Sequence, residues 1–507
     1  MFREERQEMR QNIRDLLPVE CFRRGTLWIG GQWCCATDGG AFAVTSPIDG
    51  QHLMVASRAQ AVDADRAVRA ADAVAASWAS DSGKRTGLLL RIAQEIRKHA
   101  QELGTIETLD SGRPISETTT DSVQHAAELF GYYAGLADKL HGSTVPMGND
   151  ATALVEREPF GVIGAISAWN YPLLNAATKI APIIACGNTI VLKPAEQSPL
   201  VTLLLGALMQ QAGLPDGVVN IITGFGAEAG APLVTHPMVS KISFTGSMLT
   251  GRRVAAAAGE ALKGVILELG GKSPLIVFDD ADLPRAASAA VFSTFKNAGQ
   301  TCTSCARVLV ARPLMDQFAR LCGSIAAELR IGDPFDPETQ VGPLISAEQL
   351  TRVRRLTADV DAWHACQKHY RPVEGGHFFP PMIVTKHALD SDFARQEIFG
   401  PVMALRPFDT DEEAWQLAND TEYGLAASVW TSSLRRAERA RRSLVSGIVW
   451  INCAHTLSNG TPIGGHKASG LGIEHGVEAA EQYMKVKTSV IMSGGWHSPF
   501  STRSASP

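Results

Sequence analysis

One cysteine of the chain has neighbours that suit a reactive thiol. Cys302 lies in the segment Asn297-Ala-Gly-Gln-Thr-Cys-Thr-Ser-Cys305, between a predicted helix over 286–295 and a predicted strand over 308–310. Small and hydroxyl-bearing residues surround the sulfur, so a substrate has room to approach it. A thiolate at this position would be a nucleophile. Because most single cysteines are only small buried hydrophobic residues, this hypothesis depends on the groups that accompany Cys302.

Cys302 and Cys305 form a C-x-x-C pair, a spacing typical of redox pairs and of half of a zinc site. The sequence contains no second C-x-x-C and no H-x₃-H to complete a set of four ligands, so we expect no metal site. The chain has nine cysteines, an odd number, and no secretory signal precedes them. A disulfide framework is therefore not expected, and Cys305 is expected to be a bystander.

Two further polar residues follow predicted strands. Glu268 ends the apolar run Val265-Ile-Leu-Glu before a Gly-Gly turn. Burial would raise the pKa of its carboxyl towards neutrality, which suits a general base, although a salt-bridged glutamate at a strand end is the simpler alternative. Asn170, in Ser167-Ala-Trp-Asn-Tyr-Pro172, lies where α/β folds present ligand-binding groups. Its amide could donate to a developing oxyanion.

A possible phosphate-binding element lies between these segments. Phe244-Thr-Gly-Ser247 ends a predicted strand and begins a predicted helix from Met248. Backbone N–H groups at such a helix start can hold a phosphate. The glycines at 224, 226 and 230 miss the dinucleotide-binding spacing by one residue and carry little weight.

Two series of short apolar runs indicate the elements that position these residues. The first series covers 161–167, 189–192, 218–222 and 241–244, and the second covers 275–278, 308–310, 426–430 and 447–451. Buried strands of parallel sheets have this pattern, and the spacing suits βαβ units. A helical pattern over 60–140 precedes the first series. The sequence therefore predicts an α/β fold with two α/β domains.

Composition excludes several classes of protein. Of the 507 residues, 45% are hydrophobic and 20% are charged, and the net charge is −5. No basic excess exists for binding nucleic acid. The sequence has no run of 18 apolar residues that would predict a membrane span. Its first residues contain no apolar run typical of a signal peptide, and Glu4, Glu5 and Glu8 do not fit an acid-poor transit peptide. We expect a cytoplasmic protein that binds neither nucleic acid nor membranes.

Seven motifs occur in the order found in one family. They are Trp169-Asn-Tyr-Pro, Lys193-Pro-Ala-Glu196, Phe244-Thr-Gly-Ser247, Leu267-Glu-Leu-Gly-Gly271, Gly299-Gln-Thr-Cys302, Glu397-Ile-Phe-Gly-Pro401 and Pro462-Ile-Gly-Gly-His-Lys-Ala-Ser-Gly470. On these motifs the chain resembles the NAD(P)-dependent aldehyde dehydrogenase superfamily from about residue 27 to 492, and specifically its hydrolytic, non-acylating type.

The resemblance implies a Rossmann-type cofactor domain, a second α/β catalytic domain and a small β oligomerisation arm. We expect a helical extension over 1–25, the NAD-binding domain over 26–138 and 160–268, and the catalytic domain over 269–470. The arm and the C-terminal tail are expected over 139–159 and 471–507. Such an arm implies a homodimer or a homotetramer.

The resemblance also implies catalytic roles. Cys302 would attack a small-molecule aldehyde, and the Asn170 amide with the Cys302 backbone N–H would hold the oxyanion. Glu268 would activate the water that releases the acid; relatives that transfer the acyl group to coenzyme A typically lack this glutamate. Lys179 and Glu474 match the partners of that base in proton transfer.

Cofactor and substrate positions follow from the same motifs. Lys193 and Glu196 match residues that bind the adenosine ribose, and because a carboxylate repels a 2′-phosphate we expect NAD, with NADP possible. Gly246 and Ser247 would contact the pyrophosphate. The residues matching the nicotinamide half are Trp169, Gln349, Glu397 and Phe399. The expected pocket residues are Tyr171, Thr178, Thr301, Thr303, Leu457 and Ile463.

Several pocket positions depart from the family pattern. Thr178 stands where many relatives carry an aromatic residue, and Ile463 replaces the usual phenylalanine. The stretch Ala454-His-Thr-Leu457 also lacks the common aromatic side chains. We therefore expect a wide, less aromatic pocket for a bulky or polar aldehyde.

Two other functions are compatible with parts of the sequence. One is a catalytically silent, cofactor-binding structural protein, against which the intact Cys302, Glu268 and Asn170 argue. The other is a cysteine hydrolase with Glu268 as base, which would leave the Lys193–Glu196 and Phe244–Ser247 segments without a purpose.

Overall fold

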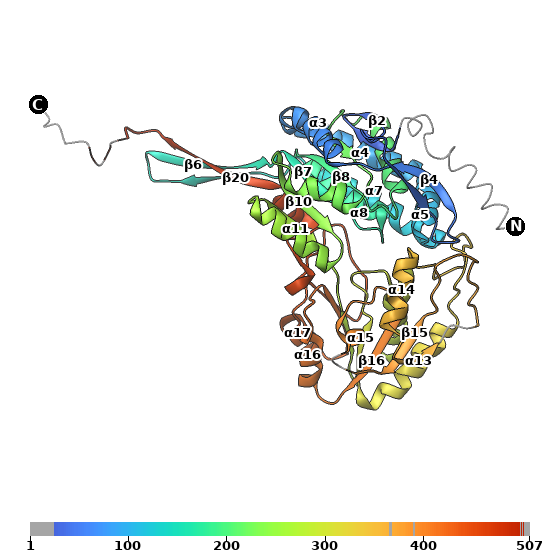
Figure 1. Ribbon diagram of the computed structural model, residues 1–507. Coiled ribbons are helices and arrows are strands. Elements are labelled where there is room, and N and C mark those ends of the chain that lie inside the picture. Colours follow the sequence, from blue (N-terminus) through green and yellow to red (C-terminus); the bar gives the residue numbers. More distant parts are fainter. Residues whose placement is uncertain (1–24, 365–367, 389–390, 497, 499, 501–507) are drawn as a thin grey trace, which may run out of the picture.

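The computed structural model describes residues 25–364, 368–388, 391–496, 498 and 500. The predicted N-terminal helical extension lies almost wholly outside this range. Figure 1 shows two α/β lobes, one above the other, and a narrow β arm that projects sideways from the upper lobe. The predicted α/β fold is confirmed.

The first lobe is built on a sheet with the strand order β19-β11-β10-β7-β8-β9-β1-β2. Its strands are β1 Leu27–Ile29, β2 Gln32–Cys34, β7 Val162–Ile166, β8 Thr189–Lys193, β9 Val219–Ile221, β10 Val239–Thr245, β11 Gly264–Glu268 and β19 Gly470–Leu471. The central strands β11, β10, β7, β8 and β9 pair in parallel. The first predicted series of strands is therefore correct. Because these strands run parallel in the sheet, their carboxyl ends share one edge.

Helices cover this sheet. They are α3 Ala61–Ala79, α4 Ser82–Lys98, α5 Ala100–Ser111, α6 Ile115–Glu117, α7 Val123–Leu136, α8 Pro172–Ala185, α9 Leu200–Gln211, α10 Ala231–Thr235 and α11 Met248–Glu260. Helix α4 begins where the Asp81 side chain accepts the Lys84 N–H at 3.0 Å, a typical N-cap. Its residues Leu88, Leu89, Ile92 and Ile96 are buried, as their helical spacing predicts.

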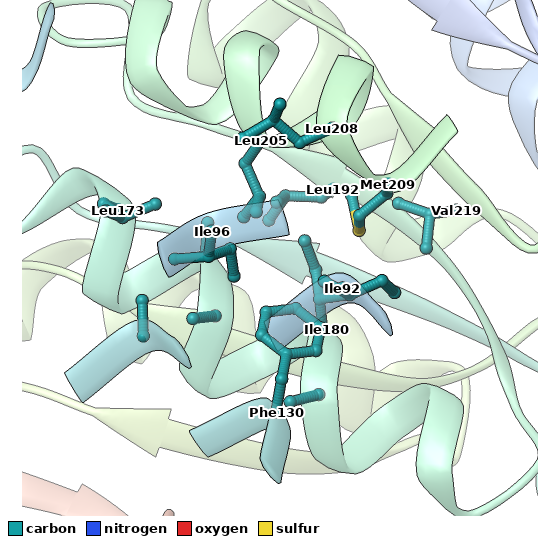
Figure 2. Packing of buried hydrophobic residues seen from close by; sticks show 14 of the residues in the cluster. Ile92, Ile96, Phe130, Leu173, Ile180, Leu192, Leu205, Leu208, Met209 and Val219 are labelled. Carbon is teal, nitrogen blue, oxygen red and sulfur yellow. The ribbon is translucent and has the colours of Figure 1, made fainter. Parts of the chain in front are cut away.

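The core of this lobe lies between the helices and the sheet. Figure 2 shows Ile92 and Ile96 of α4 packed near Phe130 of α7 and Ile180 of α8. These side chains are fully buried, so the hydrophobic effect holds α8 firmly under the sheet. Helix α8 matters for the site because it carries three polar residues, Asn175, Thr178 and Lys179, among its apolar ones.

The second lobe contains a sheet with the order β14-β15-β16-β13-β12-β17-β18. Its strands are β12 Pro274–Val277, β13 Arg307–Ala311, β14 Asp361–His364, β15 Met382–Lys386, β16 Val402–Phe408, β17 Ala426–Trp430 and β18 Ile448–Ile451. The second predicted series is correct, but β15 and β16 were not predicted. The polar residues near their ends, such as Lys386 and Arg406, interrupt the apolar pattern.

The helices of the second lobe flank that sheet. They are α12 Leu283–Phe295, α13 Met315–Ala327, α14 Ala347–Leu356, α15 Asp392–Arg395, α16 Asp411–Asn419 and α17 Leu434–Ser443; α18 Gly476–Gln482 follows β19 and contacts α8. Helix α12 ends directly before the segment that contains Cys302, and β13 follows that segment. Both flanking elements match the predicted ones.

The arm is a three-stranded sheet of β5 Ser143–Pro146, β6 Ala151–Pro159 and β20 Met484–Met492. Strands β6 and β20 pair antiparallel along their full length, from Met484–Pro159 to Met492–Ala151. A separate hairpin joins β3 Ala41–Thr45 and β4 His52–Ser57. Among the described residues, the helices are all too short or too polar to cross a bilayer.

Candidate active site

The parallel register of the first sheet gathers polar residues at one edge. Ile166 pairs with Lys193 and with Phe244, and Thr245 pairs with Glu268. The segments that follow β7, β8, β10 and β11 therefore emerge side by side. These segments carry Asn170, Glu196, Ser247 and Gly271, so residues from four separate motifs converge.

The turn before Cys302 has an unusual backbone. Asn297, Ala298 and Gly299 have φ angles of 51°, 53° and 74°, a region that residues other than glycine rarely adopt. A Cβ atom on Gly299 would lie 2.1 Å from the Gly400 carbonyl oxygen, so only glycine fits there. Strain of this kind persists where the surrounding structure compensates for it.

Hydrogen bonds hold this turn against the first lobe. The Asn297 side chain donates to the Asn170 carbonyl oxygen at 2.8 Å. The Asn170 amide nitrogen in turn donates to the Gln300 carbonyl oxygen at 3.0 Å. An amide nitrogen has two N–H groups, so Asn170 can donate a second hydrogen bond. The structure thus brings Asn170 and the nucleophile segment together, as the proposed oxyanion site requires.

The turn after Glu268 lies on the other side of Cys302. A Cβ atom on Gly271 would lie 2.5 Å from the Cys302 carbonyl oxygen, so the two segments touch backbone to backbone. Glu268 is buried, and its Oε1 atom has no hydrogen-bond partner among the described residues. Burial raises the pKa of this carboxyl well above its usual range, and the charge of Glu474 raises it further while Lys179 opposes the shift. An unpartnered, buried carboxyl with a raised pKa suits a general base.

Lys179 and Glu474 form a buried ion pair behind Glu268. The Lys179 Nζ atom lies 2.7 Å from Glu474 Oε1 and 3.0 Å from the Ser243 hydroxyl. Lys179 is fully buried, so its charge needs this partner. The structure therefore places both residues, predicted as partners of the base, in electrostatic contact with Glu268.

The Cys302 thiol is held in its protonated form. Although the residue is partly exposed, desolvation raises the pKa of the thiol to about 12, and the carboxylates of Glu268 and Glu397 contribute to the shift. A reaction at neutral pH therefore requires that a base remove the proton. Cys305, by contrast, is fully buried in the second core and its backbone N–H donates to the Ser293 hydroxyl at 3.0 Å.

The residues matched to the adenosine half of a dinucleotide lie at the edge of the first sheet. Lys193 Nζ lies 3.0 Å from Glu196 Oε2, and burial lowers the pKa of Lys193. Ser247 caps α11 by accepting the Thr250 N–H at 3.3 Å. The buried Thr245 hydroxyl beside it has no partner among the described residues. Backbone N–H groups at the start of a helix such as α11 can hold a pyrophosphate.

The residues matched to the nicotinamide half belong to both lobes. The rings of Trp169 and Phe399 meet edge to face at 5.2 Å. The Gln349 side chain donates to the Phe399 carbonyl oxygen at 2.7 Å, so it supports the backbone of this segment. Glu397 accepts the Gly271 N–H at 2.9 Å, and burial raises the pKa of its carboxyl to about 7.

The expected pocket residues have contacts in both lobes. The Tyr171 hydroxyl lies 2.8 Å from the Thr301 hydroxyl. The Thr178 hydroxyl lies 3.5 Å from His475 Nε2, and Thr303 lies 3.5 Å from His455 Nδ1. Leu457 and Ile463 are half-buried against the second core.

Sequence reasoning missed the aromatic residues near Thr303. The ring of Trp450 stacks on His455 with centroids 5.5 Å apart, and Phe292 meets the same imidazole edge to face at 5.9 Å. These residues lie in β18 and α12, where they resemble ordinary core residues, so only His455 carried a sequence signal. These rings lie around His455, and the expectation of a less aromatic pocket stays a prediction.

No cluster of three or more metal-ligating side chains occurs in the parts of the chain that the structure describes. The site instead combines a thiol, a buried carboxyl group, an amide donor and the residues matched to a dinucleotide. These groups lie where the two lobes meet.

Comparison with known proteins identifies the family. The aldehyde dehydrogenase family model matches residues 33–489, and the chain belongs to this family.

Solved structures of relatives match almost the whole chain. One is the complex of PnpE with nicotinamide adenine dinucleotide; a structure of PnpE from Pseudomonas sp. WBC-3 also matches. The complex is 37% identical in sequence and has a TM-score of 0.91, and the match covers 94% of this chain and 99% of that chain. The NAD⁺ complex of an aldehyde dehydrogenase from Bacillus cereus is 37% identical, with a TM-score of 0.89 and coverages of 92% and 96%. A betaine aldehyde dehydrogenase double mutant from Staphylococcus aureus is 33% identical, with a TM-score of 0.91 and coverages of 96% and 100%.

Proposed function

We propose that this protein oxidises an aldehyde to the carboxylic acid with NAD, by covalent catalysis at Cys302. The observation that carries the proposal is the contact of the Cys302 segment with Asn170 on one side and with the Glu268 turn on the other. The NAD complexes of PnpE and of the Bacillus cereus relative support the choice of cofactor. The silent structural protein and the cysteine hydrolase both leave part of this arrangement without a role.

In the first step, Cys302 attacks the aldehyde carbon and a C–S bond forms. Because the thiol is protonated at neutral pH, its proton must leave as the C–S bond forms. The oxyanion of the thiohemiacetal accepts the free N–H of the Asn170 amide and the Cys302 backbone N–H.

NAD, which Lys193, Glu196 and Ser247 would hold, would supply the acceptor for the hydride that leaves the thiohemiacetal carbon. The carbon then remains on Cys302 as a thioester. Glu268 removes a proton from a water molecule, the hydroxide attacks the thioester carbonyl, and the C–S bond breaks to release the acid and the thiol. The Lys179–Glu474 pair gives Glu268 a buried ionic partner through which the proton can leave.

Removing the oxyanion donor should slow the chemical step. We expect Asn170→Ala to lower kcat by on the order of 10²–10³-fold, the usual loss for one such donor. Steady-state formation of reduced nicotinamide measures the effect, and a melting curve checks that the variant folds. Asn188→Ala, which removes a buried amide remote from Cys302, is the control. A loss in kcat smaller than about tenfold would contradict the role.

Glu196 should set the preference for NAD. In Glu196→Gln the carboxylate that repels a 2′-phosphate is gone, so we expect the ratio of kcat/KM for NAD over NADP to narrow by about tenfold. Glu260→Gln, which removes the same charge at the far end of α11, should leave the ratio unchanged. An unaltered ratio in Glu196→Gln counts against the assignment of the ribose site.

We also propose that the arm mediates a homodimer or homotetramer, and that the protein is cytoplasmic. Val145, Val486, Val490 and Ile491 are exposed on the three-stranded arm, and a sheet this small gains stability from a partner. The division into an extension, two domains and an arm stays a prediction.

A further inference from the structure

His455 lies against the segment that contains Cys302. Its Nε2 atom lies 2.8 Å from the Ser293 hydroxyl, and its Nδ1 atom lies 3.5 Å from the Thr303 hydroxyl, one residue from Cys302. The first contact is a good hydrogen bond, whereas the second is at the outer limit. A ligand that offers a better partner can therefore replace the Thr303 contact at Nδ1.

The backbone and neighbouring rings hold this imidazole in place. His455 and Asn452 have φ angles of 55° and 54°, which cost energy for residues other than glycine. Asn452 exchanges two hydrogen bonds with the Thr431 backbone, at 2.9 and 2.8 Å, and Trp450 Nε1 donates to the Thr456 carbonyl oxygen at 2.8 Å. A strained loop with so many anchors presents its side chain in one fixed orientation.

The groups around His455 carry no unpaired positive charge from His455 or Lys296. Desolvation lowers the pKa of His455 to about 4, so the imidazole is neutral at physiological pH. The nearest cation, Lys296, forms an ion pair with Asp121 at 2.6 Å. A carboxylate on the substrate would therefore find no unpaired positive charge in His455 or Lys296, and a neutral polar group fits better.

A quaternary ammonium substrate is also disfavoured. Such cations need open aromatic faces, but His455 covers one face of Trp450. The Lys296 ammonium already lies 5.3 Å from the centre of the Phe292 ring. A second cation there would meet both an occupied ring and a like charge.

We propose that His455 is a specificity-determining residue, whose imidazole, together with the Thr303 hydroxyl, hydrogen-bonds a hydroxyl group on the side chain of the aldehyde substrate. This inference rests on the proposed aldehyde oxidation. The substrate class is then hydroxylated aldehydes. An alkyl analogue binds less well because it leaves the polar atoms of His455 and Thr303 without a new partner.

The test compares pairs of substrates that differ only in a hydroxyl or a methyl group. We use the ortho, meta and para hydroxybenzaldehydes with the corresponding methylbenzaldehydes, and hydroxypropanal with butanal. The variant His455→Phe keeps a ring against Trp450 but removes both nitrogens, His455→Asn keeps a polar group, and Thr456→Val is the control on an exposed neighbour. For each pair we divide kcat/KM of the hydroxylated aldehyde by kcat/KM of its methyl analogue. Dividing this ratio for a variant by the ratio for the wild type cancels the intrinsic reactivities of the two aldehydes.

We expect His455→Phe to lower this ratio by about tenfold for at least one pair, His455→Asn to restore part of it, and Thr456→Val to leave it unchanged. Thr303→Val should lower the ratio as well, and it tests the proposal if His455→Phe does not fold. Ratios that are unchanged in both variants for every pair would overturn the proposal.

A second readout needs no cofactor. The same aldehydes should protect Cys302 from alkylation by iodoacetamide, measured by mass spectrometry, with the hydroxylated members protecting better in the wild type than in His455→Phe. Discrimination in this assay without any formation of reduced nicotinamide would refute the proposed oxidation but support the pocket. Turnover without discrimination in either assay would refute the role of His455 alone.

Discussion

Cys302→Ala should lose aldehyde-dependent formation of reduced nicotinamide by on the order of 10⁴-fold or more, the scale seen when a covalent nucleophile is removed. The substitution deletes the atom that forms the thiohemiacetal and the thioester, and no other cysteine can replace it. Cys305, three residues away, is fully buried, and its sulfur lies 3.6 Å from the Thr303 carbonyl oxygen.

Absorbance of reduced nicotinamide with a panel of aldehydes measures this loss. Cys305→Ala is the matched control, and we expect it to retain most of the activity because its sulfur takes no part in the reaction. Melting curves of both variants check that they fold. Substantial turnover in Cys302→Ala would refute the assignment of the nucleophile, and equal loss in both variants would point to a structural effect instead.

Glu268→Gln should separate the two halves of the reaction. Without the base, water attacks the thioester slowly, and we expect the steady-state rate to fall by about 10²–10⁴-fold. Hydride transfer still occurs once on each subunit, so a burst of reduced nicotinamide should precede the stalled phase. Stopped-flow absorbance measures the burst, and mass spectrometry detects the acyl group on Cys302. A normal steady-state rate without a burst would contradict the role of Glu268.

The raised pKa of Glu268 gives the wild-type reaction a pH dependence. The carboxyl acts as a base only when ionised, so the rate of thioester hydrolysis should rise as pH increases through its pKa. Glu474 raises that pKa and Lys179 lowers it. The pH at which the rate of thioester hydrolysis is half its maximum should therefore be lower in Glu474→Gln and higher in Lys179→Met than in the wild type. Values of this pH that stay in place, or that move in the opposite directions, would exclude this coupling.

The sequence by itself determined the order of the elements and the chemical types at the site. Short apolar runs such as 189–192 predicted buried strands, because a parallel sheet covered on both faces requires apolar residues throughout. Polar residues directly after these strands, such as Asn170, were recognisable because their motifs are local and have fixed spacing. These features depend on a few consecutive residues, so they can be predicted without knowing the fold.

The tertiary structure decided which of these residues meet. Lys179 and Glu474 are 295 positions apart, yet their charged atoms lie 2.7 Å from each other. The hydrogen bond from Asn170 to the Gln300 carbonyl oxygen also joins the two lobes. Strands β15 and β16 were missed because polar residues at their ends interrupt the apolar pattern. Pairing stabilises them in the sheet, where β16 pairs with β13 and β15 pairs with β16.

The state of each group in the site likewise comes from its surroundings in space. The pKa of Cys302 rises to about 12 because its neighbours exclude water and include two carboxylates, one of them from the motif at 397–401. His455 became a candidate for substrate recognition only when Trp450, Ser293 and Thr303 were found around it. Desolvation and long-range contacts are properties of the folded chain, whereas residue type and local spacing are already present in the sequence.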